Sequence, residues 1–180
     1  MENTPRSAPP PTPDASASTL NISGSGASVL HLEIAEQAAK SLSGANWFFW
    51  IAGLSLVNSV IVLMNGQWSF LAGLGVTQVI DGMSQALLPR LGTTATVLAL
   101  VMDLAAAGVI VTFGLMARQG HAWAFVLGMI LYALDGLIFL LVGDWLSLAF
   151  HAYALYCIYR GYAANNRLKQ LNEEIQAQPA

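Results

Sequence analysis

Residues 123–161 read WAFVLGMILYALDGLIFLLVGDWLSLAFHAYALYCIYRG. Two mainly apolar segments, 123–142 and 145–162, are separated here only by Gly143 and Asp144. Each segment approaches the roughly 20 residues that a helix needs to cross the hydrocarbon core of a bilayer. The stretch therefore predicts two membrane-spanning helices joined by a short Gly-x-Trp turn.

The composition of the whole chain also indicates a membrane protein. Hydrophobic residues make up 56% of the 180 residues and charged residues 9%, whereas an ordinary soluble domain has roughly 25% charged residues. The mean hydropathy is +0.58. The net charge of −3 forms no basic patch, so nucleic acid is not a predicted partner. The only cysteine is Cys157, which excludes an internal disulfide, CxxC redox chemistry and cysteine-built zinc sites. The predicted partner is the lipid bilayer, and no cofactor is predicted.

Two further spans and one ambiguous helix precede this pair. Residues 47–64 and 94–117 are long and apolar enough to cross. Residues 68–88 are also long enough, but polar residues lie opposite an apolar stripe, which favours a helix lying in the membrane interface with Asp81 on its polar face. Pro89 then breaks the chain before the next span. The polar residues are Thr77, Gln78, Asp81, Ser84 and Gln85, and the apolar stripe is Val76, Ile80, Met83 and Leu87.

The two ends of the chain differ from the apolar middle. Residues 1–28 are rich in Pro, Ser, Thr, Ala and Gly and predict a disordered tail without the apolar segment of a signal peptide. Residues 29–45 carry apolar residues at helical spacing from Leu30 to Leu42, which predicts an amphipathic juxtamembrane helix. Residues 164–180 predict a polar tail that extends the last helix into water.

The distribution of basic residues predicts the orientation in the membrane. If residues 68–88 do not cross, nearly all Lys and Arg near the spans fall on one side, which the positive-inside rule assigns to the cytoplasm. We therefore expect an all-α fold: a membrane-embedded four-helix bundle over residues 46–163, with one outer interfacial helix and one N-terminal amphipathic helix. The protein would be multi-pass in the inner (plasma) membrane, with both termini cytoplasmic. The basic residues on the predicted cytoplasmic side are Lys40, Arg118, Arg160, Arg167 and Lys169, and Arg90 lies on the other side.

Tryptophans and glycines support the same arrangement. Tryptophans near the ends of apolar segments are typical interface anchors, and glycines within spans favour close helix packing. The predicted anchors are Trp47, Trp50, Trp68, Trp123 and Trp145, and the predicted packing glycines are Gly108, Gly114, Gly128 and Gly136.

Four polar residues lie at a similar depth in four different spans. Counted from the outer ends of the spans at about 1.5 Å per residue, each lies roughly 10 Å below the outer boundary. Ionisable groups in hydrocarbon are costly, so they mark either a functional site or a polar contact between helices. Gln67 and Asp144 would lie at the outer mouth of this layer. Its members are Asn58, Asp103, Asp135 and His151.

Three functions fit this layer. In the first, a protonated carboxyl and its hydrogen-bond partners hold the helices in register. In the second, Asp103, Asp135 and His151 carry protons or ions through the membrane. In the third, the same residues bind a metal or act on a lipid as acid and base, although no HExxH or GxSxG signature is present. We favour the first, a non-enzymatic accessory or scaffold subunit. Its further partners would be other membrane subunits or a second copy of the chain.

One part of the chain resembles a family. The elements that carry the resemblance lie in residues 123–161, about a quarter of the chain, and they resemble the C-terminal half of small bacterial four-pass integral membrane proteins. The resemblance implies a location in the bacterial inner membrane, and it implies no activity. The matching elements are Tyr132-Ala133-Leu134-Asp135-Gly136, Asp144-Trp145, Phe150-His151 and Tyr159-Arg160-Gly161.

Overall fold

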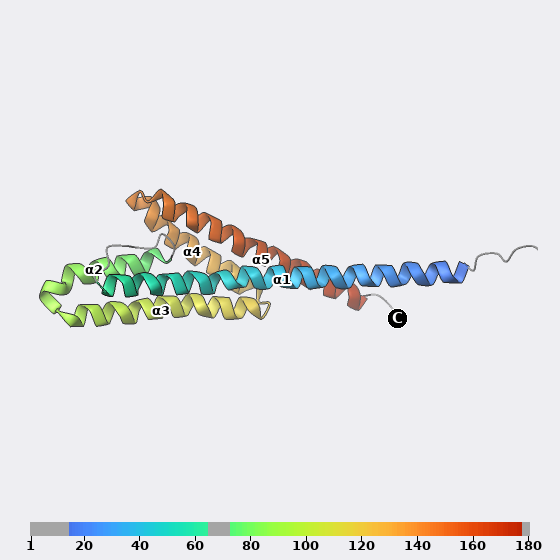
Figure 1. The fold of residues 1–180 in the computed structure, drawn as a ribbon, viewed down its shortest axis with the longest axis horizontal. Coiled ribbons are helices and arrows are strands. Elements are labelled where there is room, and N and C mark those ends of the chain that lie inside the picture. Colours follow the sequence, from blue (N-terminus) through green and yellow to red (C-terminus); the bar gives the residue numbers. More distant parts are fainter. Residues whose placement is uncertain (1–14, 65–72, 178–180) are drawn as a thin grey trace, which may run out of the picture. The chain divides into compact units, whose positions relative to one another are not determined.

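The computed structural model describes residues 15–64 and 73–177, with side chains from residue 28 onward. These residues form helices and no strand, so the all-α class predicted from the sequence is confirmed. Gln67, Trp68 and the start of the predicted helix 68–88 lie outside the described residues, as do residues 1–14 and 178–180 of the two tails. The helices are α1 (Ala15–Leu63), α2 (Gly75–Leu91), α3 (Thr93–Arg118), α4 (Ala122–Val142) and α5 (Trp145–Ala177), shown in Figure 1.

Three of these helices contain segments long and apolar enough to cross a membrane. Within the described part of the chain they are Ser28–Leu63, Thr93–Arg118 and Ala122–Val142. They indicate a multi-pass membrane protein associated with the lipid bilayer. The first half of α5, predicted as a fourth span, is not among them. It carries His151, Arg160 and several tyrosines, which lower its hydropathy.

The chain divides into two compact units, residues 1–35 and residues 36–180. In the first unit the backbone is helical from Ala15 onward, inside the range for which the sequence predicts a disordered tail. The last proline of the tail is Pro13, so nothing in residues 15–35 removes a helical hydrogen bond.

In the second unit, residues 36–63 form one uninterrupted helix. The sequence instead predicts a separate surface helix that ends at residue 45. The contact between Gly44 and α5 explains the difference. The two helices approach so closely there that a Cβ atom on Gly44 would collide with the backbone of Gly161. This part of α1 is therefore packed inside the bundle and does not lie on its surface, and its buried residues include Ser41, Gly44 and Ala45.

The helices α2 and α3 form an antiparallel pair (Figure 1). Pro89 lies inside the last turn of α2, and the helix continues to Leu91. The reversal occurs instead at Gly92, whose φ of 57° lies in the left-handed region that glycine adopts without strain. The break predicted at Pro89 is therefore displaced to Gly92.

The polar side of α2 faces inward. Thr77, Asp81 and Ser84 are buried, and Asp81 is only 9% exposed. The apolar side faces outward, with Val76 39% and Met83 60% exposed. The prediction that Asp81 lies on the polar face of a surface helix is wrong, because this polar face is buried against other helices. In water an amphipathic helix turns its polar side outward. In lipid the opposite orientation is favourable, because polar groups find hydrogen-bond partners only inside the protein.

The centre of the bundle is built around Phe48 of α1. Its side chain is fully buried and lies against Gly114 of α3 and Gly128 of α4. A Cβ atom on Gly128 would lie 2.5 Å from Phe48 Cε1, so the ring fits only because glycine stands there. Gly108, for which the sequence also predicts close packing, has open space where its Cβ would be. The packing role is thus confirmed for Gly114 and Gly128 and is wrong for Gly108.

Candidate functional site

Asp135 of α4 caps the N-terminus of α2. Its Oδ2 accepts a hydrogen bond from the amide of Gly75 at 2.6 Å, and its Oδ1 accepts one from the amide of Val76 at 2.8 Å. The first amides of a helix have no partner within the helix and lie at the positive end of its dipole. The Asp135 carboxylate, supplied by another helix, therefore gives these amides hydrogen-bond acceptors and places a negative charge at the positive end of the α2 dipole.

A side chain of α1 binds the amide of Leu74, the residue that precedes Gly75 and Val76. The amide of Leu74 donates to Ser55 Oγ at 2.6 Å, and this hydroxyl donates to the carbonyl of Ile51 at 2.9 Å. Asn58, one turn further along α1, is 2% exposed and lies beside Gly73, where a Cβ atom would be 3.1 Å from Asn58 Nδ2. Three consecutive amides at the start of α2 are thus bound by side chains of α1 and α4.

His151 of α5 completes this group. Its Nε2 lies 3.1 Å from Asp135 Oδ2, and its Nδ1 lies 2.9 Å from the carbonyl oxygen of Ser147. Because that carbonyl can only accept, Nδ1 is the donor in this contact. The imidazole is 1% exposed and stacks on the ring of Tyr132 at 4.3 Å. We call Ser55, Asp135, His151 and the amides of Leu74, Gly75 and Val76 the polar clasp.

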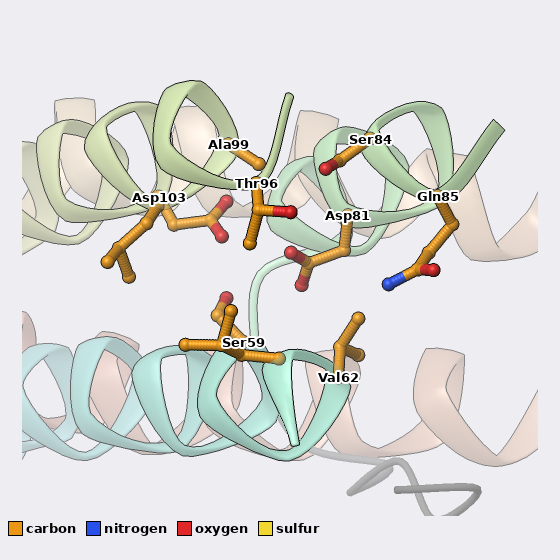
Figure 2. A pocket seen from close by; sticks show the side chains of 10 residues that line it. Ser59, Val62, Asp81, Ser84, Gln85, Thr96, Ala99 and Asp103 are labelled. Atoms are coloured by element: carbon orange, nitrogen blue, oxygen red, sulfur yellow. The ribbon is translucent and has the colours of Figure 1, made fainter. Parts of the chain in front are cut away.

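Asp103 does not join the polar clasp. It lies in a separate cavity of about 20 Å³ between α1, α2 and α3, together with Asp81 (Figure 2). Its side chain is fully buried, and neither of its carboxyl oxygens has a hydrogen-bond partner among the described residues. The cavity is lined by Ser59, Val62, Leu63, Asp81, Ser84, Gln85, Thr96, Ala99, Leu100 and Asp103.

The charge in this cavity is not balanced by its lining. Among the described residues that line it, none is Lys, Arg or His, whereas two are carboxylic acids. Figure 2 shows the carboxyl groups of Asp81 and Asp103 pointing into the same space. An ionised carboxylate that is buried without a partner is strongly unfavourable. We call this space the Asp81–Asp103 cavity.

Asp144, predicted at the outer mouth of the layer, caps α5. Its Oδ2 accepts a hydrogen bond from Ser147 Oγ at 2.6 Å, and its Oδ1 accepts one from the Ser147 amide at 3.1 Å. These two hydrogen bonds, the hydroxyl contribution being the larger, lower the pKa of the Asp144 carboxyl. The geometry is that of an N-cap, which satisfies a free amide of the helix.

The predicted tryptophan anchors that the structure describes occupy two environments. Trp47 packs edge-on against Tyr153, with ring centroids 5.4 Å apart. Trp50, Trp123 and Trp145 are 65%, 50% and 70% exposed. Exposed indole rings are what an interface anchor requires, and the anchoring role itself stays a prediction.

The predicted polar layer is thus divided between two places. Asn58, Asp135 and His151 gather around the start of α2, whereas Asp103 faces Asp81. Sequence reasoning missed the role of Asp81, although its position opposite the apolar stripe of α2 marked one side of that helix as polar. It also missed the α2 amides, because backbone groups leave no signal in a sequence. In the described part of the chain, no three His, Cys, Asp or Glu side chains come together, so Asp103, Asp135 and His151 do not form one metal-binding group.

The three candidate spans and these two buried sites indicate the class: an all-α, multi-pass membrane protein with ionisable groups inside its helix bundle. Comparison of the chain with known protein families, with characterised proteins and with solved structures gives no match.

Proposed function

We propose that this protein is a non-catalytic, four-span subunit of the bacterial inner membrane that serves as an accessory or scaffold component. The observation that carries the proposal is the polar clasp. Both carboxylate oxygens of Asp135 are engaged in contacts with α2 and His151, so this side chain joins α2, α4 and α5. Polar contacts of this kind between membrane helices contribute about 0.6 to 2 kcal/mol each and fix the register of the helices.

In this proposal α2 is a half-helix that enters the bundle without crossing the membrane. It starts beside Ser55, within the predicted first span, and Asp81 then lies near Ser59 on the wall of the same cavity. α2 therefore runs in the same direction as α1, and α3 returns antiparallel to both. The crossing helices would be α1, α3, α4 and α5. A helix start at membrane depth needs partners for its amides, which the polar clasp supplies.

The positions of basic side chains support cytoplasmic termini. Lys40 and Arg160 line one pocket, and Arg118 lies 5.7 Å from the ring of Phe49 on α1. Asn165 of α5 donates a hydrogen bond to the carbonyl of Gly120 at 3.2 Å, which ties the α3–α4 turn to the same end of the bundle. Arg90, near the end of α2, lies at the opposite end. Such a bias in Lys and Arg sets the orientation of membrane proteins.

The test of the scaffold role is the mass of the assembly in native membranes. The protein, expressed at its natural level, is extracted in a mild detergent and its mass is measured. We expect a particle larger than one chain that contains either further copies or other membrane subunits. A single free chain at natural abundance, extracted under conditions that preserve a known membrane complex, would contradict the proposal.

The second candidate function is a proton- or ion-conducting component, and the unpartnered carboxyl of Asp103 is the observation that favours it. Asp135 and His151 are already paired with each other, so the path would run through Asp81 and Asp103 instead. Flux of protons or Na⁺ into liposomes that Asp103→Asn abolishes would support this candidate. Absence of flux under an imposed pH or sodium gradient would contradict this second candidate and leave the scaffold role as the proposed function.

A further inference from the structure

The Asp81–Asp103 cavity ends at the carboxyl group of Asp103, which has no hydrogen-bond partner in the described part of the chain. Asp103 is 0% exposed, neither of its oxygens is hydrogen-bonded among the described residues, and both face the cavity (Figure 2). The cavity volume of about 20 Å³ exceeds the roughly 10–15 Å³ that one water-sized particle needs. The site therefore has room for one small particle directly against a buried carboxyl.

The polar groups around the cavity are suited to a hard cation. Besides the two carboxyls, Ser59, Ser84 and Thr96 offer hydroxyl oxygens, and Gln85 offers an amide oxygen. The hydroxyl of Ser59 donates its hydrogen to the carbonyl of Ser55 at 3.3 Å, so its lone pairs remain available to a cation. Oxygen ligands of this kind favour hard metal ions over the softer transition metals.

The charge of the cavity favours a monovalent over a divalent ion. The lining offers two carboxyls, and its other oxygen ligands are neutral hydroxyl and amide groups. Two neighbouring carboxyls that retain one proton carry one negative charge between them, so a single positive charge is sufficient to balance them.

From these observations we propose that the Asp81–Asp103 cavity binds one monovalent cation, either Na⁺ or a proton. The carboxyls come from α2 and α3, and α1 contributes only Ser59, Val62 and Leu63, so Asp81 and Asp103 are the only titratable groups among the lining residues that the structure describes. The site does not depend on the scaffold role, since an accessory subunit and an ion-conducting component could both contain it.

The route to the site follows from the exposure of its residues. Gln85 is exposed, Asp81 is 9% exposed and Asp103 is fully buried, so exposure falls in this order among the three side chains that carry a carboxyl or amide group. A cation would meet Asp81 first and reach Asp103 last. The position of Asp81 depends in turn on the polar clasp, because Asp135 holds the start of the helix that carries it.

Thermal unfolding of the purified full-length protein tests this proposal. Unfolding is measured in detergent at constant ionic strength, with Na⁺ replaced by choline, over a range of pH. A ligand that binds only the folded state stabilises it. For a sodium site we expect saturating Na⁺ to raise the midpoint of the wild type by about 2 °C or more. The increase should disappear in Asp103→Asn and Asp81→Asn and persist in Glu173→Gln, which makes the same change at an exposed position of α5.

A second set of results distinguishes the proton from Na⁺. If the proton is the occupant, Na⁺ has no effect, but acidification stabilises the wild type more than Asp103→Asn, because the proton binds the folded carboxyl pair more tightly than the unfolded one. Ser59→Ala keeps both carboxyls and should weaken only sodium binding. The proposal is overturned if the wild type unfolds at the same midpoint in Na⁺ and in choline and its pH dependence equals that of both aspartate variants.

Discussion

At the scale of single residues, two buried aspartates of this bundle are in opposite situations. Asp135 accepts hydrogen bonds from two amides and faces His151, whereas Asp103 has no hydrogen-bond partner among the described residues. The same substitution should therefore affect the stability of the protein differently at the two positions. Asp135→Asn keeps only one acceptor oxygen for two amides and should destabilise the protein by about 1–3 kcal/mol, the cost of an unsatisfied buried donor. Asp103→Asn removes an uncompensated carboxyl and should leave stability unchanged or higher in the absence of a bound cation.

Chemical unfolding of the two variants in choline-containing buffer measures this difference directly. His151→Ala serves as a further control, because it removes the partner of Asp135 and leaves both α2 amides bound. Equal destabilisation by Asp135→Asn and Asp103→Asn would show that the α2 cap has no special role.

At the scale of helices, packing depends on where a glycine meets a ring. Gly128 contacts the fully buried ring of Phe48, whereas Gly108 on α3 has open space at its Cβ position. Gly128→Ala should destabilise the protein by about 1–3 kcal/mol, because an extra methyl group in a filled core forces its neighbours apart. Gly108→Ala should be neutral or stabilising by up to about 1 kcal/mol, since alanine is the better helix former. Thermal unfolding of both variants in one detergent is the measurement, and a larger loss in Gly108→Ala than in Gly128→Ala would refute the packing assignment.

The helices also show how far sequence reasoning reaches. Apolar runs of sufficient length predict α3 and α4 because hydrophobicity alone selects membrane segments. For α2 the pattern identified two sides but not their directions, because an amphipathic helix has the same pattern whether its polar side meets water or the inside of a bundle. Depth along each helix could likewise be counted, but rotation about the helix axis could not. Asp103 and Asp135 were therefore grouped together, although they face different neighbours.

At the scale of the whole molecule, the direction of α2 determines on which side of the membrane every later turn lies. If α2 does not cross, the α3–α4 turn lies on the same side as the start of the α1 span; if α2 crosses, the two lie on opposite sides. Single cysteines in a Cys157→Ser background separate these cases. We expect an impermeant maleimide added to intact cells with a permeabilised outer membrane to label Thr93→Cys, at the start of α3, and to leave Glu36→Cys and Gln119→Cys unlabelled.

Lysis of the cells should make all three cysteines reactive, which controls for side chains that are merely hidden. Label at Gln119→Cys before lysis, together with protection at Thr93→Cys, would mean that α2 crosses the membrane. The polar clasp would then have to lie close to one membrane surface, because α2 begins there. The buried amides of Leu74, Gly75 and Val76, all bound by side chains of other helices, are instead what a helix start at membrane depth requires.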